Sequence, residues 1–273
     1  MANYRTRLRN IGCPELSINA AKEKRRTTGK GPNQVKKPRK AEVSYCPDYP
    51  IGETKASLEL ERKILLLEVK KKNQPLIKAK MERTFAYRRQ EIIQDMPFIT
   101  EFQDRWPALF SESELNAEFT RITTVPLLSR IMSKLDHYTN QLMKVFRKKG
   151  GAAGHKMSMI VAAMDKNPTV ETRRECILKA LCVYLNGNPE NFIKDYVVVE
   201  PGAMRAMEEK VMEIYVIRHE GAEPTESPED VGIIIEGVEV LQDLRDVANG
   251  CAVLFGLIYS LNLTYPKRPE IHV

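Results

Sequence analysis

The chain has 273 residues, 42% of them hydrophobic, so it is long enough and apolar enough to bury a sizeable core. Its net charge of +7 hides two unlike parts: residues 1–94 hold 23 Lys and Arg against 10 Asp and Glu, whereas the remainder holds 20 against 26. This distribution excludes a uniformly basic protein that binds nucleic acid over its whole surface. The five cysteines are scattered without a CxxC pair, which favours reduced thiols in a cytosolic or nuclear protein over a disulfide framework.

The N-terminal part is predicted to contain little ordered structure. Residues 1–12 resemble the end of a helix that begins upstream, and residues 13–52 are predicted as a basic, disordered linker. From residue 17 onward this linker is rich in Lys, Arg, Gly and Pro and poor in large aliphatic side chains. It therefore cannot bury enough apolar surface to become ordered by itself.

Two basic clusters in this linker have the spacing of a bipartite nuclear-import signal, which a receptor groove binds in extended form. A solvated linker that contacts nucleic acid nonspecifically is the alternative interpretation. Aromatic side chains that could stack on bases are scarce there, since only Tyr45 and Tyr49 follow the second cluster. The residues expected to contact an import receptor or nucleic acid are Lys24, Arg25, Arg26, Lys36, Lys37, Arg39 and Lys40.

Residues 53–187 are predicted to form a multi-helix domain. Apolar side chains at helical spacing indicate a helix over 54–72, in which Leu60, Ile64 and Leu67 form one apolar stripe beside a heavily charged face, as in an amphipathic helix. Pro75 can open a second helix, and Ser111 with Glu114 has the pattern of a capping box. A further helix is predicted over about 171–185.

The longest predicted helix follows Thr124 and Pro126 and ends at Gly150 and Gly151. Its apolar side chains form a heptad seam of barely two and a half heptads: Leu128, Ile131, Leu135, Tyr138, Leu142 and Val145. A coiled coil needs three or four heptads. Packing inside a monomer is therefore the favoured interpretation, and pairing between subunits is the alternative.

The last third is predicted as a small α+β unit over 188–273. Short β-branched stretches indicate strands at 196–200, 214–219 and 231–237. A buried helix near 250–262 is expected to cover this sheet. A membrane helix is the alternative there, but the apolar core from Cys251 to Leu261 has only eleven residues, and a bilayer span needs about 20. We expect no membrane contact.

The fold class is therefore predicted as mainly α. A multi-helix domain carries a small C-terminal α+β unit packed on it, and a basic disordered segment precedes both.

Arg218 and His219 end a predicted strand, as in the motif that opens the histidine phosphatases. That motif needs Arg-His-Gly in direct succession, whereas Glu220 separates His219 from Gly221. A carboxylate beside the acceptor histidine would repel the phosphate dianion. A turn at the end of the strand is the favoured interpretation.

Other candidate sites are weaker. Residues 149–158 resemble a phosphate-binding loop only loosely, because the spacing is short and His155 displaces the lysine, so a turn that ends a helix is favoured. The histidines and cysteines lack metal-ligand spacing. We expect no enzyme activity, catalytic residues, cofactor or metal. Trp106 is favoured as a core residue, with a partner anchor as the alternative.

Several long stretches resemble the sterile alpha motif domain-containing protein 3-like group, over essentially the whole chain. They include "ANYRTRLRNIGCPEL", "KKPRKAEVSYCPDYP", "RWPALF", "ITTVPLLSR" and "RRECILKALCVYLN". The small helical interaction domain that gives the group its name is not located in this sequence, so the resemblance is to the C-terminal region of that architecture or to a shortened member. It implies an intracellular interaction protein and transfers no active site.

The expected function is that of a noncatalytic adaptor or scaffold in the nucleus, the cytoplasm or both, which contacts other proteins through its helical middle. The alternative is a chromatin-associated or nucleic-acid-binding protein that uses the basic N-terminal segment. Salt dependence separates the two, because counterion release weakens nucleic-acid binding steeply as salt rises, whereas contacts in a helix groove persist.

Residues 20–44 fused to a cytosolic reporter should carry it into the nucleus, because they contain both basic clusters. Replacing Lys36, Lys37, Arg39 and Lys40 by Ala should leave the reporter in the cytoplasm, as fluorescence microscopy would show. Equal nuclear signal from both fusions would contradict the import hypothesis.

Overall fold

The computed structural model of the chain describes residue 40 and residues 42–162, 164, 168–197, 209–222 and 226–263. The predicted helix end at residues 1–12 lies outside the described residues, as do all the candidate import residues except Lys40. Lys40 is exposed to solvent.

Helices make up most of the described chain, and the predicted fold class, mainly α with a small C-terminal α+β unit, is confirmed. The α-helices are α3 (Lys55–Lys70), α4 (Gln74–Arg83), α5 (Phe85–Gln90), α6 (Ile99–Arg105), α7 (Glu112–Thr123), α8 (Leu127–Lys148), α9 (Gly151–Val161), α10 (Val170–Tyr184) and α12 (Val247–Ser260). A π-helical turn η2 (Glu91–Asp95) and the 3-10 turns η3 (Pro107–Phe110) and η5 (Pro189–Asn191) lie between them.

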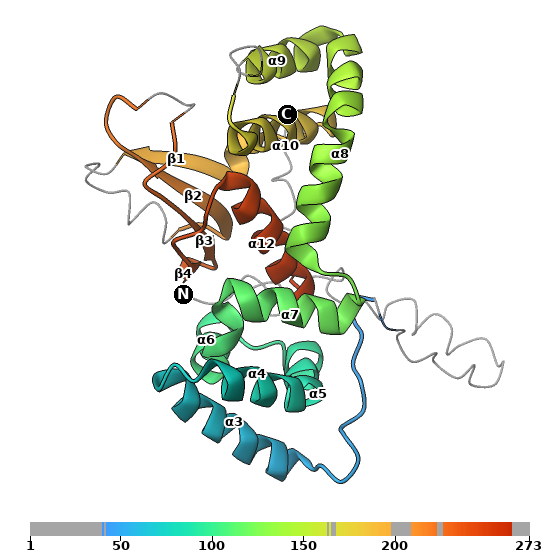
Figure 1. Cartoon of the computed structure of the whole chain (residues 1–273), viewed down its shortest axis with the longest axis vertical. Helices are drawn as coiled ribbons and strands as arrows, with labels where there is room; N and C mark the ends of the chain where they lie inside the picture. The colour runs from blue at the N-terminus through green and yellow to red at the C-terminus, as the bar shows by residue number, and fades with distance from the viewer. Residues whose placement is uncertain are drawn as a thin grey trace, which may run out of the picture.

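Figure 1 shows how these elements are arranged. Helices α3 to α7 lie together at one end of the molecule, and α8 leads from α7 along one side toward α9 and α10 at the other end. The sheet lies on the opposite side from α8, and α12 runs between them.

Several helices begin where the sequence supplies a cap. The Asp246 carboxylate accepts from the backbone N–H of Asn249 at 2.8 Å, and the Ser111 hydroxyl accepts from that of Glu114 at 3.4 Å. Thr54 and Thr169 cap α3 and α10 in the same way. Each cap satisfies a backbone donor that has no partner inside its own helix.

The sheet has the order β1-β2-β3-β4, formed by β1 (Ile193–Val197), β2 (Met212–Arg218), β3 (Asp230–Ile235) and β4 (Val238–Leu241). The first pair is parallel and the other two are antiparallel. Glu236 and Gly237 connect β3 to β4 with φ of 57° and 75°, the left-handed backbone of a two-residue hairpin turn. The short strand β4 was not predicted, and β1 begins at Ile193 rather than at residue 196.

Helix α12 covers the sheet, as the sequence predicts. A Cβ at Gly250 would lie 3.2 Å from methyl carbons of both Ile214 and Val231, and one at Gly256 would lie 2.4 Å from Cδ2 of Leu127. The two glycines therefore let α12 approach the sheet and α8 closely. In the described part of the chain, no helix combines the length and hydropathy that crossing a membrane requires.

Two of the hydrophobic clusters in the described part of the chain contain most of its buried apolar side chains. The larger core joins α3 to α7 with the sheet and α12, so the helices and the C-terminal unit bury apolar side chains together. The smaller core lies between α8, α9 and α10 and contains Leu135, Met143, Phe146, Met157, Val161, Ile177, Ala180 and Val183.

Two predicted segments differ from the structure. Lys149 and Gly150 do form the turn that ends α8, but the following residues of 149–158 continue as α9. Part of the predicted linker is also ordered, because Arg89 donates hydrogen bonds to the carbonyls of Val43, at 2.7 Å, and Tyr45, at 3.0 Å. These contacts supply the order that the composition of residues 42–52 could not predict.

Candidate interaction surface

Helix α3 turns an unusual set of side chains toward the core. Leu58 and Leu65 are fully buried, and the polar side chains of Glu61, Arg62 and Glu68 are buried beside them. Buried charges need partners, since an unpaired ion in the interior is costly. Partners for these charges must therefore come from α3 itself or from neighbouring elements.

Those neighbours come mainly from α4 and the region around α6. The Glu61 carboxylate accepts from Lys80 Nζ at 2.5 Å and lies 3.1 Å from Nη1 of Arg83. Arg62 Nη2 donates to Glu59 at 2.7 Å, and its Nη1 donates to the carbonyl of Arg105 at 3.2 Å. These pairs fix which side of α3 faces inward.

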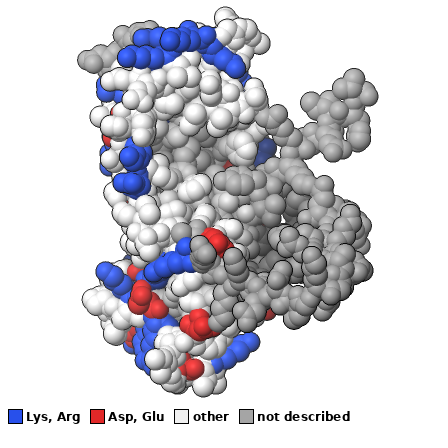
Figure 2. All heavy atoms as spheres, turned by 90° about the vertical axis from the view of Figure 1, so that its right-hand side faces the viewer, with Lys and Arg blue, Asp and Glu red and all other residues white. Residues whose placement is uncertain are grey.

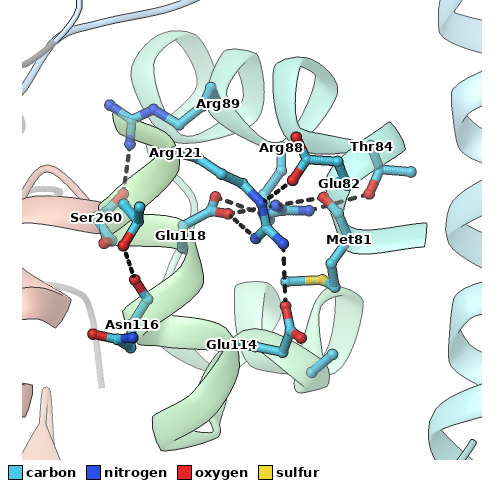
Figure 3. Close-up of polar contacts among 12 residues, drawn as sticks. Met81, Glu82, Thr84, Arg88, Arg89, Glu114, Asn116, Glu118, Arg121 and Ser260 are labelled. Carbon is cyan, nitrogen blue, oxygen red and sulfur yellow. Dashed lines mark hydrogen bonds and ion pairs between the residues drawn. The ribbon is translucent and has the colours of Figure 1, made fainter. Parts of the chain in front are cut away.

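The centre of the polar network is the ion pair between Arg88 of α5 and Glu118 of α7 (Figure 3). Both side chains are 0% exposed, and two parallel N–H···O contacts of 2.9 and 2.6 Å join them. Arg88 also donates to the hydroxyl of Thr84 and the carbonyl of Met81. A guanidinium in this bidentate geometry satisfies most of its donors without water.

Arg121 extends the network toward the surface. It contacts Glu118 at 2.9 Å, Glu82 at 2.7 Å and Glu114 at 3.4 Å (Figure 3). Burial alone would raise the pKa of Glu118, but the charges and hydrogen bonds of Arg88 and Arg121 lower it below its ordinary value. Glu118 is therefore held as a carboxylate.

Trp106 belongs to a second polar cluster and is a core residue. It is 0% exposed, and its indole N–H donates to Glu91 at 2.6 Å. The guanidinium carbon of Arg88 lies 5.0 Å from the centre of its ring, within the range of a cation–π contact. The alternative prediction that Trp106 anchors a partner is therefore wrong, because a partner cannot reach it.

The same cluster stabilises the ionised form of Glu59. Its pKa falls to about 2, first because Arg62 donates a hydrogen bond to it, against a smaller rise caused by burial, and then because Tyr87 donates another. Tyr87 reaches it at 3.0 Å, and the pKa of Tyr87 is in turn raised, first by burial. Arg105 also pairs with Glu91 and Glu59.

Helix α3 presents its apolar stripe to solvent, and this outer face is the candidate interaction surface. Leu60 is 60% exposed and Leu67 is 55% exposed, with Ile64 half-buried between them. We name these three residues the α3 stripe. The inward side of α3 is instead occupied by Leu58, Leu65 and the paired charges, so the apolar stripe of this amphipathic helix does not face the core.

The phosphatase-like motif has the geometry of a strand end. Arg218 donates to Asp195 at 2.7 Å and to the carbonyl of Glu226 at 2.8 Å, so its guanidinium is engaged with the protein itself. His219 is mostly exposed and lies 3.6 Å from Glu229. Over the described ranges, no group of three or more His, Cys, Asp or Glu side chains is placed to hold a metal ion.

Residues 58–111 match the family model described as Sterile alpha motif domain-containing protein 3, helical domain. The resemblance seen in the sequence is confirmed over these residues, which run from the first turn of α3 to the residue that caps α7. The chain therefore contains a helical domain of this type, and the α3 stripe lies inside it. Neither a curated protein nor a solved structure matches the chain.

Removing the carboxylate of Glu118 should strongly destabilise the fold. Glu118→Ala leaves Arg88 buried without its partner, which costs about 3–5 kcal/mol of unfolding free energy. Urea unfolding followed by circular dichroism measures the loss. The matched control is Glu82→Ala, which removes a carboxylate that also pairs with Arg121 but is 70% exposed and should cost less than about 1 kcal/mol. Equal losses of unfolding free energy in the two variants would contradict the role of Glu118 as the buried partner of Arg88.

The contribution of Glu59 should disappear in acid. Its pKa in the folded state is lowered from 4.5 to about 2, so the stabilisation is present above pH 4.5 and is lost as the pH falls toward 2. The difference in unfolding free energy between the wild type and Glu59→Gln should shrink over this interval. A difference that stays constant with pH would show that the ionisation of Glu59 contributes nothing.

Proposed function

We propose that the protein is a noncatalytic adaptor or scaffold that binds other proteins through the outer face of its helical domain, in the nucleus or while shuttling between nucleus and cytoplasm. The observation that carries this proposal is the exposure of the α3 stripe. The two basic clusters between Lys24 and Lys40 support the nuclear location.

The α3 stripe leaves leucine side chains in unfavourable contact with water. Single exposed apolar residues are ordinary, but Leu60 and Leu67 are two turns apart on one helix, with Ile64 between them. Fully burying a leucine against a partner contributes about 1.5–3 kcal/mol. Such a row fits the side of an amphipathic helix or a groove on another protein.

The polar network supports the noncatalytic part of the proposal. Arg88 with Glu118, and Arg105 with Glu91, are ion pairs inside the domain. Charged groups that satisfy one another in this way hold helices together rather than presenting an acid or base to a substrate. The charges near α3 are therefore best explained as supports for the surface above them.

The basic N-terminal segment supports nucleic-acid association as a second candidate function. Residues 1–94 carry 23 Lys and Arg against 10 Asp and Glu, an excess that attracts phosphate backbones. Binding of this kind should weaken steeply with salt and should persist when the α3 stripe is changed.

Replacing Leu60 and Leu67 by Ser should remove protein partners without unfolding the domain, because both side chains are mostly in solvent. The measurement is quantitative mass spectrometry of proteins crosslinked to the full chain in cells. The recovered amount of each protein that binds the α3 stripe should fall about tenfold. This is the effect of losing a contact worth about 1.4 kcal/mol.

The matched control replaces Ile51 and Val125 by Ser, since these residues are also exposed but lie outside α3. It should retain the partners, and thermal unfolding should confirm that both double variants fold. An unchanged set of partners in the α3 variant would contradict the proposed function.

A further inference from the structure

Helix α8 carries a second outward face, separate from the α3 stripe. Its inward side contains Leu127, Leu135, Thr139, Met143 and Phe146, which are buried. Of the predicted heptad seam, only Leu135 is buried: Tyr138 and Val145 are each 41% exposed, and the remaining members are half-buried. The intramolecular core therefore uses one edge of the seam and leaves the other edge in solvent.

A row of cations follows the solvent edge of the seam. Arg130, Lys134, Lys144 and Lys148 are exposed at spacings that place them along one side of the helix. Figure 2 shows Lys and Arg gathered over the upper part of this side of the molecule, with little acidic surface between them. We name Ile131, Tyr138, Leu142 and Val145 with these four cations the α8 face.

The charge of the α8 face is not neutralised within the described residues. No carboxylate there forms an ion pair with Arg130, Lys134, Lys144 or Lys148. The one acidic residue of α8, Asp136, pairs with Arg174 of α10 at 2.6 Å. Lys134 lies over the ring of Tyr138, with Nζ 5.6 Å from its centre, so the cationic row and the apolar row adjoin.

From this arrangement we infer that the α8 face binds an acidic amphipathic helix of another protein. The apolar row of such a helix would cover Tyr138 and Val145, and its Glu or Asp side chains would pair with the flanking cations. This surface and its partner do not depend on the function proposed for the α3 stripe.

Other occupants fit the α8 face less well. A second copy of the chain would place its own cations against these cations in either helix orientation, and like charges repel. A nucleic-acid backbone would neutralise the cations but leave Tyr138 and Val145 in water. A helix lying in a membrane surface needs a broad free apolar side, whereas that side of α8 is packed against α9, α10 and α12.

The acidic stretch of the chain itself is also a poor occupant. Residues 220–230 contain Pro224 and Pro228, and proline interrupts a helix. The occupant that remains is therefore a helix supplied by a separate protein.

The test uses the full chain and a fluorescently labelled synthetic peptide of the same length as α8, with Leu at helical spacing and Glu on both flanks. Fluorescence anisotropy should show saturable binding. A peptide of the same composition in scrambled order, which has no apolar face, should bind about tenfold more weakly, because it can make only the charge contacts.

Variants locate the binding on α8. Lys134→Glu with Lys148→Glu should weaken binding at least about tenfold, since attraction becomes repulsion. The matched control, Lys55→Glu with Lys78→Glu, makes the same change of net charge at exposed sites on α3 and α4 and should retain binding. Tyr138→Ser with Val145→Ser should also weaken binding, with thermal unfolding as the check on folding.

Each contrary outcome overturns the inference in a distinct way. Equal binding of the two peptides would reduce the effect to nonspecific charge attraction. Equal weakening of peptide binding by both pairs of lysine substitutions would show that the peptide does not bind at α8. A dimer in sedimentation that Tyr138→Ser with Val145→Ser dissociates would make the partner a second copy of the chain. Leu60→Ser with Leu67→Ser should leave peptide binding unchanged, so failure of the α3 proposal is distinguishable.

Discussion

The structure depends first on the burial of Arg88 and Glu118 as a pair. Two ions removed from water lose their hydration, and their mutual contact, with the hydrogen bonds from Arg88 to Thr84 and Met81 and the contact of Arg121 with Glu118, compensates for that loss. Their bidentate geometry, with both side chains 0% exposed, leaves little freedom for α5 to move against α7. An apolar pair of the same volume could stabilise the fold as well, so what the ion pair adds is specificity: it prescribes which side of each helix faces the other.

The buried polar contacts extend to α3 and determine which of its side chains lie at the surface of the domain. The cluster around Glu91, Trp106 and Glu59 continues the polar interior, and Arg62 joins α3 to it. Because Leu58, Leu65 and the paired charges occupy the inward side of α3, Leu60 and Leu67 face solvent. The same principle acts on α8, where packing against α9, α10 and α12 selects one edge of an apolar seam and leaves the other exposed. Both outer faces therefore follow from what the inner faces require.

Local sequence patterns predicted most of the helices and strands. Capping side chains such as Ser111 locate helix starts, β-branched runs locate β2 and β3, and an uncharged segment locates α12. Which face of each helix is buried was harder to predict, because reading the spacing of apolar residues assumes that charged side chains lie at the surface. On α3 the buried Glu61 and Arg62 reverse that assumption, because Glu61 pairs with Lys80 of α4, and Arg62 pairs with Glu59 of α3 and donates to the carbonyl of Arg105.

Other errors have similar causes. Helix α9 contains Gly151 and Gly154 in its first turn, and glycine also suits a turn between helices, so sequence spacing could not identify it. The candidate surface on α3 is visible in the sequence as an apolar stripe, but the spacing of its residues does not show that the stripe faces solvent. Polar clusters such as Glu91 with Trp106 depend on contacts between separate helices, which composition and periodicity do not contain.

Because of Arg89, completion of this fold depends on the order in which the residues of the chain are synthesised. It is fully buried, and its guanidinium donates to carbonyls near residue 45 and to that of Ser260, which follows it by 171 residues. A ribosome adds about 5–20 residues per second, so roughly 10 to 30 seconds separate the appearance of Arg89 from that of its last acceptor. Until then the guanidinium has to remain hydrated, because burial without acceptors is costly. The helical domain of residues 58–111 is therefore translated early but can close around Arg89 only after α12 has left the ribosome.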